Sequence, residues 1–256
     1  MSILKYENIR NGIRISTDNE QASFVDLEFL SQPISSSREL HIIGYEVLSS
    51  IESSFGGNYE AQSFFEDVSD ETIKAVFIAQ LEVIQRLNNS RQHKKPLFMS
   101  LNLTLSSLND DLFVEKVVAM SETPIAIEVN EYSLSSMNRA VLRNVKKLQS
   151  NGHEIWLDDY SPSNEDANRT LGAIKWDRIK IDKSFLYRSS NDFQPFKSLV
   201  SLLKNYCRKG IIVEGVESKH QQQCVMGDSV YIQGYALGYP LPLVNEETLL
   251  EKGIVD

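Results

Sequence analysis

Four groups of carboxylates in this 256-residue chain each follow a short apolar run of the kind that forms a buried strand. They are Glu46, Glu128, the pair Asp158 and Asp159, and the pair Glu214 and Glu217. In a parallel barrel, the carboxyl ends of the strands meet at the end of the fold that carries the chemistry. Like charges about 4 Å apart repel by roughly 4 kcal/mol at an effective dielectric constant of about 20, so a ring of carboxylates there opposes folding unless cations bind. The pattern therefore predicts hard divalent metal ions, and two is the expected number.

A lysine follows the same pattern in the segment Arg178-Ile179-Lys180-Ile181-Asp182. Residues two apart share a face of a strand, so Lys180 and Asp182 point the same way, opposite to the two isoleucines. Taken alone, this pair is a solvated ion pair that contributes little. Beside a ring of carboxylates, Lys180 becomes a candidate for holding a water molecule or meeting a phosphate oxygen.

Each of the other signals also has a plainer interpretation when it is taken alone. An Asp pair after a strand is most often a turn or the N-cap of a helix. Glu46 alone would be an exposed strand residue, and Asn102 and Gln233 would be ordinary residues at strand exits. Because all of them lie at strand ends, in sequence order, we favour one shared site over coincidence.

Other catalytic chemistries find little support in the sequence. The four histidines are scattered, and no two of them have the spacing of metal ligands. There is no Gly-rich phosphate loop and no Gly-x-Ser-x-Gly motif. The two cysteines have neither metal nor redox spacing. These observations favour metal-dependent chemistry on oxygen ligands.

The net charge and the hydropathy of the chain limit the kinds of partner that it can bind. With 26 basic and 35 acidic residues, the net charge is −9 and no long basic run is present, so we expect no DNA partner. A small anionic ligand fits such a chain only if bound metal ions reverse the sign of its acidic pocket. We find no signal peptide and no membrane-spanning stretch, which predicts a cytoplasmic protein without a membrane partner.

Strand-like and helix-like segments alternate from about residue 25 to the end, as in an α/β domain. Helices are predicted after Ser69 and over residues 111–120, 134–148 and 196–206. Strands are predicted at residues 25–34, 41–49, 97–103, 124–128, 155–158, 177–182, 211–213 and 230–232. Eight strands are enough to close a (β/α)8 barrel, but the short turn between the first two requires them to be antiparallel. We therefore predict a modified TIM barrel over residues 25–256, with an antiparallel strand near the N-terminus and residues 1–24 as a hairpin or loose arm.

The ordered set of motifs resembles the EAL-domain family, bacterial phosphodiesterases of cyclic di-GMP. The family's Glu-Ala-Leu motif is matched by Glu46-Val47-Leu48, with Val in place of Ala. The further matches are Gln32-Pro33-Ile34, Asn102, Glu128 with Glu131, Asp158-Asp159, Ile179-Lys180-Ile181-Asp182, Glu214-Gly215-Val216-Glu217, Gln233-Gly234-Tyr235 and Pro240-Leu241-Pro242. Together they span most of the chain.

The resemblance implies a role for each matching residue. One Mg²⁺ or Mn²⁺ ion would be held by Glu46, Asn102, Glu128 and Asp158, and a second by Asp158, Asp159 and Glu214. The catalytic residues would be Lys180, Glu214 and Glu46. The residues around the substrate or behind the ligands would be Gln32, Leu48, Ser50, Glu131, Asp182, Glu217 and Gln233. The product would be the linear dinucleotide pGpG.

Two departures from the family pattern leave alternatives open. Active members usually carry an Arg where this chain has Ser50, and losing a guanidinium–phosphate contact costs about 1.5–3 kcal/mol of binding. The loop after Asp159 has lost both family glycines and gained Pro162, which puts dimerisation and metal affinity in question. The second hypothesis is therefore a catalytically weak or inactive module that acts by binding a partner protein, cyclic di-GMP, or both. An unrelated metal-dependent barrel enzyme is the third. Whether the chain forms a homodimer stays open.

Overall fold

The computed structural model describes residues 4–17, 23–55, 58–91, 94–130, 137–189 and 192–243. Eight strands close a barrel: β3 (Phe24–Ser36), β4 (Ile42–Ser53), β6 (Met99–Leu103), β7 (Ala126–Val129), β8 (Glu154–Tyr160), β9 (Arg178–Ile181), β10 (Ile211–Val213) and β11 (Val230–Ile232). The strands from β4 to β11 run parallel, whereas β3 is antiparallel to both of its neighbours, β4 and β11. The predicted modified TIM barrel with an early antiparallel strand is confirmed.

Additional strands extend the sheet outside the barrel. β1 (Leu4–Ile9) and β2 (Gly12–Thr17) form an antiparallel hairpin, and β2 also pairs with β3. Two short strands, β5 (Asn58–Tyr59) and β12 (Leu241–Pro242), pair with β4 and β3, respectively. Among the two forms considered for residues 1–24, the described part adopts the hairpin.

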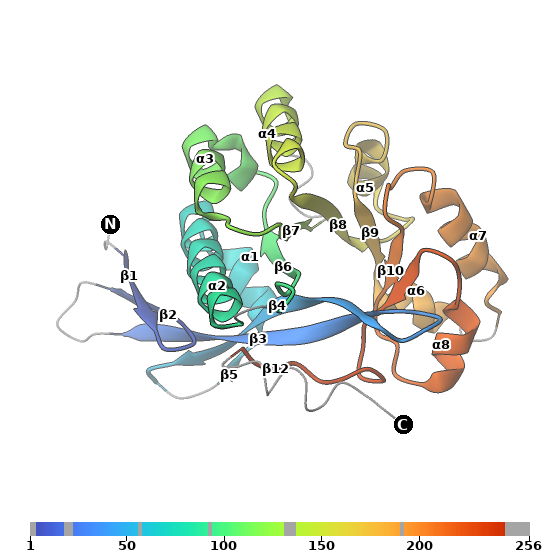
Figure 1. The fold of residues 1–256 in the computed structure, drawn as a ribbon, viewed down its shortest axis with the longest axis horizontal. Helices are drawn as coiled ribbons and strands as arrows, with labels where there is room; N and C mark the ends of the chain where they lie inside the picture. Colours follow the sequence, from blue (N-terminus) through green and yellow to red (C-terminus); the bar gives the residue numbers. More distant parts are fainter. Residues whose placement is uncertain are drawn as a thin grey trace.

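The helices lie outside the barrel. They are α1 (Ala61–Asp67), α2 (Asp70–Ser90), α3 (Asp111–Met120), α4 (Arg139–Ser150), α5 (Glu165–Thr170), α6 (Lys183–Arg188), α7 (Gln194–Leu203) and α8 (Lys219–Val225), with a 3₁₀ turn, η1, at Ser107–Asn109. Helices α2 to α7 form an arc around the parallel strands, and β3, β5 and β12 lie on the other side of the view (Figure 1). None of the described helices is long and apolar enough to cross a membrane.

Most predicted helices occur where the apolar spacing places them. Ser69 caps α2 by accepting the amide hydrogen of Thr72, and the helix buries Phe77 and Ile84 against the outer face of the barrel. The helix predicted from residue 134 begins at Arg139, because Asn138 caps it by accepting the amide hydrogens of Ala140 and Val141. Residue 134 itself lies outside the described residues.

The inside of the barrel has an apolar floor. Its buried cluster comprises Ile34, Ala126, Trp156 and Ile212, each from a different strand. Arg178 lies beside this floor, with its guanidinium 5.6 Å from the Trp156 ring and 4.2 Å from the Tyr231 ring. Two residues further along β9, on the same face, comes Lys180. The floor therefore separates the lower part of the barrel from the polar site at the carboxyl ends of the strands.

Candidate active site

Lys180 is the centre of the site. On β9, Ile179 and Ile181 point outward into the helix layer and Lys180 points inward, where only 1% of its surface is exposed. Its Nζ donates hydrogen bonds to Glu128 Oε2 at 2.6 Å and Glu46 Oε2 at 3.2 Å. It also forms ion pairs with two more carboxylates, Asp158 at 2.8 Å and Glu214 at 2.9 Å. Four acidic residues predicted from strand ends therefore converge on one ammonium group.

Amide side chains fix the orientation of Glu46. Asn102 Nδ2 donates to Glu46 Oε1 at 3.1 Å, and Gln233 Nε2 donates to Glu46 Oε2 at 2.6 Å. The same Gln233 nitrogen donates to Gln32 Oε1 at 3.0 Å, and Gln32 Nε2 donates to the carbonyl oxygen of Gly238 at 3.1 Å. This relay connects β3 and the segment after β11 to the carboxylate on β4.

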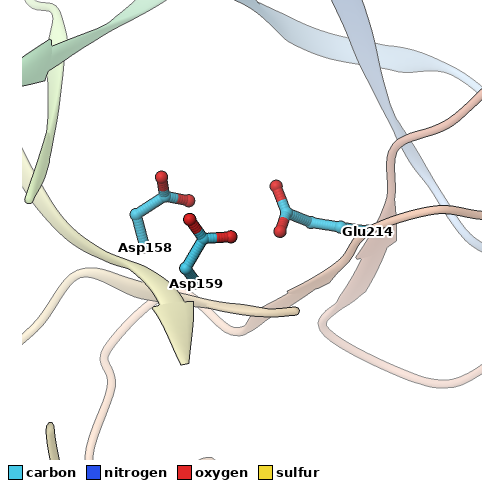
Figure 2. Close-up of side chains that lie close together, drawn as sticks. All are labelled: Asp158, Asp159 and Glu214. Carbon is cyan, nitrogen blue, oxygen red and sulfur yellow. The ribbon is translucent and has the colours of Figure 1, made fainter. Parts of the chain in front are cut away.

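A second group of carboxylates lies beside the lysine. Asp158 and Asp159, at the end of β8, lie side by side and Glu214, after β10, faces them (Figure 2). Each residue offers one carboxylate oxygen, and these oxygens lie within 4.8 Å of one another. Asp159 adopts the left-handed backbone conformation, with φ of 50°, which turns the chain at the strand end and lets consecutive aspartates serve one site.

Burial and mutual repulsion shift the pKa values of the carboxylates in this cluster. Burial raises the pKa of Glu128 and of Glu214 well above the usual range, although Lys180 opposes the effect in both. Burial also opposes ionisation of Glu46, but Lys180 and the amide hydrogen bonds outweigh it and lower the pKa of this carboxyl. The pKa of Lys180 is well above its usual range because the four carboxylates outweigh its own burial. Lys180 is therefore charged, and one ammonium cannot neutralise all the carboxylates around it.

Asp159 is affected mainly by the charge of its neighbour in the chain. The charge of Asp158 and, next, burial raise the pKa of Asp159 to about 7. Burial also raises the pKa of Asp158. An additional cation would reverse these shifts, because an opposite charge within a few ångströms favours the ionised carboxylate.

The residues present fit divalent metal ions. All candidate donors are oxygen atoms, which select hard cations such as Mg²⁺ and Mn²⁺. The completely buried Glu128 Oε1 accepts no hydrogen bond among the described residues, although Glu128 Oε2 is bonded to Lys180. A buried, unsatisfied carboxylate oxygen is costly unless a partner occupies it. The acidic cluster can therefore bind a metal ion.

A cavity of about 500 Å³ opens above the cluster. Several residues predicted to surround a substrate line it, namely Gln32, Leu48, Asp182, Glu217 and Gln233. Asp182 also caps α6 by accepting the amide hydrogen of Ser184 at 3.0 Å. Ser50 lies on the same face of β4 as Glu46 and Leu48, but it is exposed and does not line the cavity. Glu131 lies outside the described residues.

The rim of the cavity contains residues that sequence reasoning missed. Lys183 and Tyr187 lie one turn apart on α6, and Tyr187 donates from its hydroxyl to Glu217 Oε1 at 2.9 Å. Gly215, with φ of 68°, permits this approach, since a Cβ there would lie 2.5 Å from Lys183 Cβ and 2.9 Å from the Tyr187 hydroxyl. Tyr235, which the sequence comparison matched without giving it a role, also lines the cavity. The four-residue spacing of Lys183 and Tyr187, directly after the helix cap Asp182, is the sequence pattern that could have predicted that these two side chains share a helix face.

Fold and site together define an α/β-barrel protein with an acidic cluster around a buried lysine at the carboxyl ends of its strands. The family model described as "EAL domain" matches residues 20–240, which is most of the chain. The chain therefore belongs to the EAL-domain family, a family of cyclic di-GMP phosphodiesterases.

Individual relatives are distant. The chain is 28% identical over 160 residues to an "Uncharacterized signaling protein" from Caulobacter vibrioides, and 24% identical over 156 residues to the "Probable cyclic di-GMP phosphodiesterase PdeI" from Escherichia coli. These matches cover 59% and 58% of this chain, and each covers 20% of the relative, so the chain spans about a fifth of the length of these relatives. The structure of the EAL enzyme Bd1971 with cAMP and cyclic di-GMP bound superposes with a TM-score of 0.73 at 20% identity, covering 85% of this chain and 62% of that one. At this identity the likeness shows a shared fold.

Proposed function

We propose that this chain hydrolyses cyclic di-GMP to the linear dinucleotide pGpG, using two divalent ions, Mg²⁺ or Mn²⁺. The observation that carries the proposal is the convergence of four carboxylates, three of them buried, on Lys180 at the base of a cavity, within a family of cyclic di-GMP phosphodiesterases. Hydrolysis adds one water molecule across one of the two phosphodiester bonds and opens the ring.

The chain's own residues divide into those that would hold ions and those that would hold the substrate. We assign one ion to Glu46, Asn102, Glu128 and Asp158, and the other to Asp158, Asp159 and Glu214. Such ions, when bound, lower the pKa of water and stabilise charge on a phosphoryl group. The assignment is supported by the oxygen-only donor set and by the unsatisfied oxygen of Glu128.

Lys180 would stabilise the negative charge that develops on the phosphate, because it is a charged group with only 1% of its surface exposed. Gln32 and Gln233 would keep Glu46 in place through the amide relay. Lys183, the second cation that lines the cavity, would attract the anionic ligand to the rim of an otherwise acidic opening.

The experiment is turnover of cyclic di-GMP by the purified chain with Mg²⁺ and, separately, Mn²⁺, followed by chromatography. The matched control is Glu46→Gln, which keeps the shape of the side chain and removes its charge. We expect pGpG from the unmodified chain and none from the variant, with both proteins folded by circular dichroism. A folded, metal-loaded chain that gives no product at high concentration would refute the proposal.

A second function is favoured by the surroundings of Ser50. This exposed residue stands where active members usually carry an arginine, and it lies outside the cavity lining. A module that binds cyclic di-GMP or a regulatory protein without turnover is therefore the alternative. Binding of cyclic di-GMP measured by calorimetry, together with the absence of product in the turnover experiment, would establish it.

A further inference from the structure

The strand β1 forms one end of the twelve-stranded sheet, at the end of the molecule away from α7 (Figure 1). It pairs with β2 on one side, and no other strand of the described residues pairs with it. In an antiparallel pair, only every second residue directs its N–H and C=O groups toward the partner strand. The remaining residues of β1 present these groups outward. An outward row of this kind is a template on which a further strand can pair.

Proteins usually protect the edge of a sheet, and β1 lacks most of the usual protection. Proline, a bulge, a very short strand or charged side chains keep a second strand away. β1 is six residues long, contains no proline and pairs with β2 without a bulge. The other end of the sheet, β5, is only two residues long. Of the two ends, β1 is therefore the one that another strand can extend, provided that the strand matches its charges.

The charges of β1 are complementary to a second copy of the same strand. Lys5 and Glu7 lie two residues apart and share one face of β1, whereas Tyr6 points to the opposite face. A second copy related by a two-fold axis through Tyr6 runs antiparallel to the first. Lys5 of each copy then lies directly opposite Glu7 of the other, and opposite charges in this position stabilise a strand pair.

The neighbouring registers fail by the same criterion. A two-fold axis through Lys5 would place the two copies of Lys5 opposite each other, and an axis through Glu7 would do the same for the two copies of Glu7. Like charges directly opposite are destabilising. Because a two-fold axis perpendicular to the sheet keeps equivalent faces on the same side, the axis must pass through a residue. Among these registers, only the one centred on Tyr6 pairs unlike charges.

The register centred on Tyr6 also covers apolar surface. Leu4 and Tyr6 share the face of β1 on which a hydrogen bond joins the Tyr6 hydroxyl to that of Thr72 in α2, yet each has 40% of its surface exposed. In this register the two copies of Tyr6 lie opposite each other, and Leu4 lies opposite Asn8 of the second copy. Aromatic pairs across neighbouring strands add to the stability of a sheet. The contact is confined to one short strand, so the dimer is weak and reversible.

We propose that β1 is a homodimerisation strand, on which two copies of this chain pair antiparallel around Tyr6. Lys5 of each copy lies opposite Glu7 of the other, and the sheets of the two copies become continuous. The same patch serves both copies, so the contact closes after two chains. This inference does not depend on the proposed phosphodiesterase activity.

The experiment is sedimentation equilibrium of the full chain and of charge-reversal variants. The unmodified protein should dimerise with a Kd of about 10–100 µM. Glu7→Lys gives β1 two positive charges and Lys5→Glu gives it two negative charges, so each variant alone should stay monomeric at about 200 µM. An equimolar mixture of these two variants should dimerise again, because every cross-strand pair is then of opposite sign. The matched control is Lys197→Glu on α7, an equal charge reversal at an exposed residue, which should change the Kd by less than about twofold.

Within the hairpin, Glu7 lies opposite Arg14, so a loss of dimer in Glu7→Lys needs to be separated from a loosened hairpin. Recovery of the dimer in the mixture makes this separation, because a β1 strand detached from β2 would not recover. An unmodified protein that stays monomeric at about 500 µM would overturn the inference. A dimer that persists in both single variants would place the contact elsewhere on the molecule. Two monomeric variants that do not associate on mixing would refute the register centred on Tyr6.

Discussion

Substitutions of the single residue Ser50 are expected to change the affinity for cyclic di-GMP strongly. It lies on the same face of β4 as Glu46 and Leu48, and its partner across the antiparallel strand pair is Glu28. A serine at this place cannot make the forked contact that arginine makes with a phosphate. An introduced arginine, however, could pair with Glu28 instead of with a ligand.

We therefore predict that Ser50→Arg tightens cyclic di-GMP binding by about tenfold, and that Ser50→Arg with Glu28→Gln tightens it by up to about a hundredfold. Ser50→Lys is the control, because a lysine supplies charge without the fork and should gain less. Isothermal titration in the presence of EDTA measures the affinity without turnover. Equal affinities for all four proteins would show that position 50 does not meet the ligand.

At the level of single residues, the sequence identified the acidic members of the site but not their differences. Lys180 and its four carboxylate partners were all predicted, since strand alternation and strand ends place them on one face at one end of the barrel. That Lys180 forms ion pairs with Asp158 but not with the adjacent Asp159 depends on the three-dimensional arrangement at the end of β8, which no spacing rule contains. The sequence also showed that both family glycines after Asp159 are lost, and the loop does without them, since from 158 to 166 only Asp159 itself has a positive φ.

Among the elements, the segment that leads into β8 contains a buried histidine. His153 Nδ1 accepts the amide hydrogen of Ile125, at 3.4 Å, so this nitrogen carries no proton. Burial lowers the pKa of His153 below 6.5, its ordinary value. The unfolded chain therefore binds a proton near pH 6.5 that the folded chain resists. Stability is fully present above this pH and is lost as the pH falls towards the folded-state pKa.

We predict that His153→Asn, which keeps an acceptor near the position of Nδ1, reduces this loss. Urea unfolding between pH 7.5 and 5.5 should give a free energy that falls less steeply with acidification in the variant than in the unmodified protein. The raised pKa values of the acidic cluster affect both proteins equally and cancel in the comparison. Parallel curves for the two proteins would contradict the prediction.

The segment after β11 depends on a glycine. Gly234 has φ of 149°, and a Cβ there would lie 2.3 Å from the carbonyl oxygen of Val216 and 2.4 Å from its nitrogen. Gly234→Ala must therefore push apart two backbone segments that place Gln233. We expect a loss of about 1–3 kcal/mol in the free energy of unfolding. Gly172→Ala is the matched control, because a Cβ at Gly172 meets nothing within 4 Å and should cost under about 0.5 kcal/mol. Denaturant titration compares the two, and equal losses would exclude the clash.

The eight barrel strands were predicted from the sequence more accurately than the short helices. Buried parallel strands read as apolar runs, and all eight predicted runs fall on observed strands. Helix α5 was predicted as a polar loop, and helices α6 and α8 were not recognised, because six or seven residues contain too few turns for a periodic signal. Each of these helices instead begins at a polar cap, namely Asn164, Asp182 and Ser218. Capping residues were the more informative signal there.

At the scale of the whole molecule, the hairpin β1–β2 bears on the extent of the domain. The EAL-domain match begins at residue 20, yet Ile13 is 2% exposed and belongs to the same core cluster as Leu27 and Phe77. Hydrogen bonds also join the hairpin to α2, from Asn8 to Glu82 and between Tyr6 and Thr72. We propose that residues 4–17 unfold together with the barrel and are part of the domain.

We therefore predict that Ile13→Ala costs about 2–4 kcal/mol in the free energy of unfolding, as expected for a cavity in a well-packed core. Leu4→Ala, at a β1 residue with 40% of its surface exposed, is the control and should cost under about 0.5 kcal/mol. Both values come from urea titration of the full chain followed by circular dichroism. If Ile13→Ala were as mild as the control, the hairpin would be an independent arm.

The arginine and the lysine inside the barrel both come from β9, two residues apart. A shift of β9 by one residue against β8 and β10 would turn Ile179 and Ile181 inward and send both cations into the apolar helix layer. Arg178 would lose its aromatic neighbours, and the carboxylates of the site would face one another without Lys180. The two charges on β9 therefore disfavour a misaligned barrel during folding. The burial of apolar side chains alone would disfavour this misaligned barrel less. The same two charges that build the interior of the barrel also select its correct strand alignment.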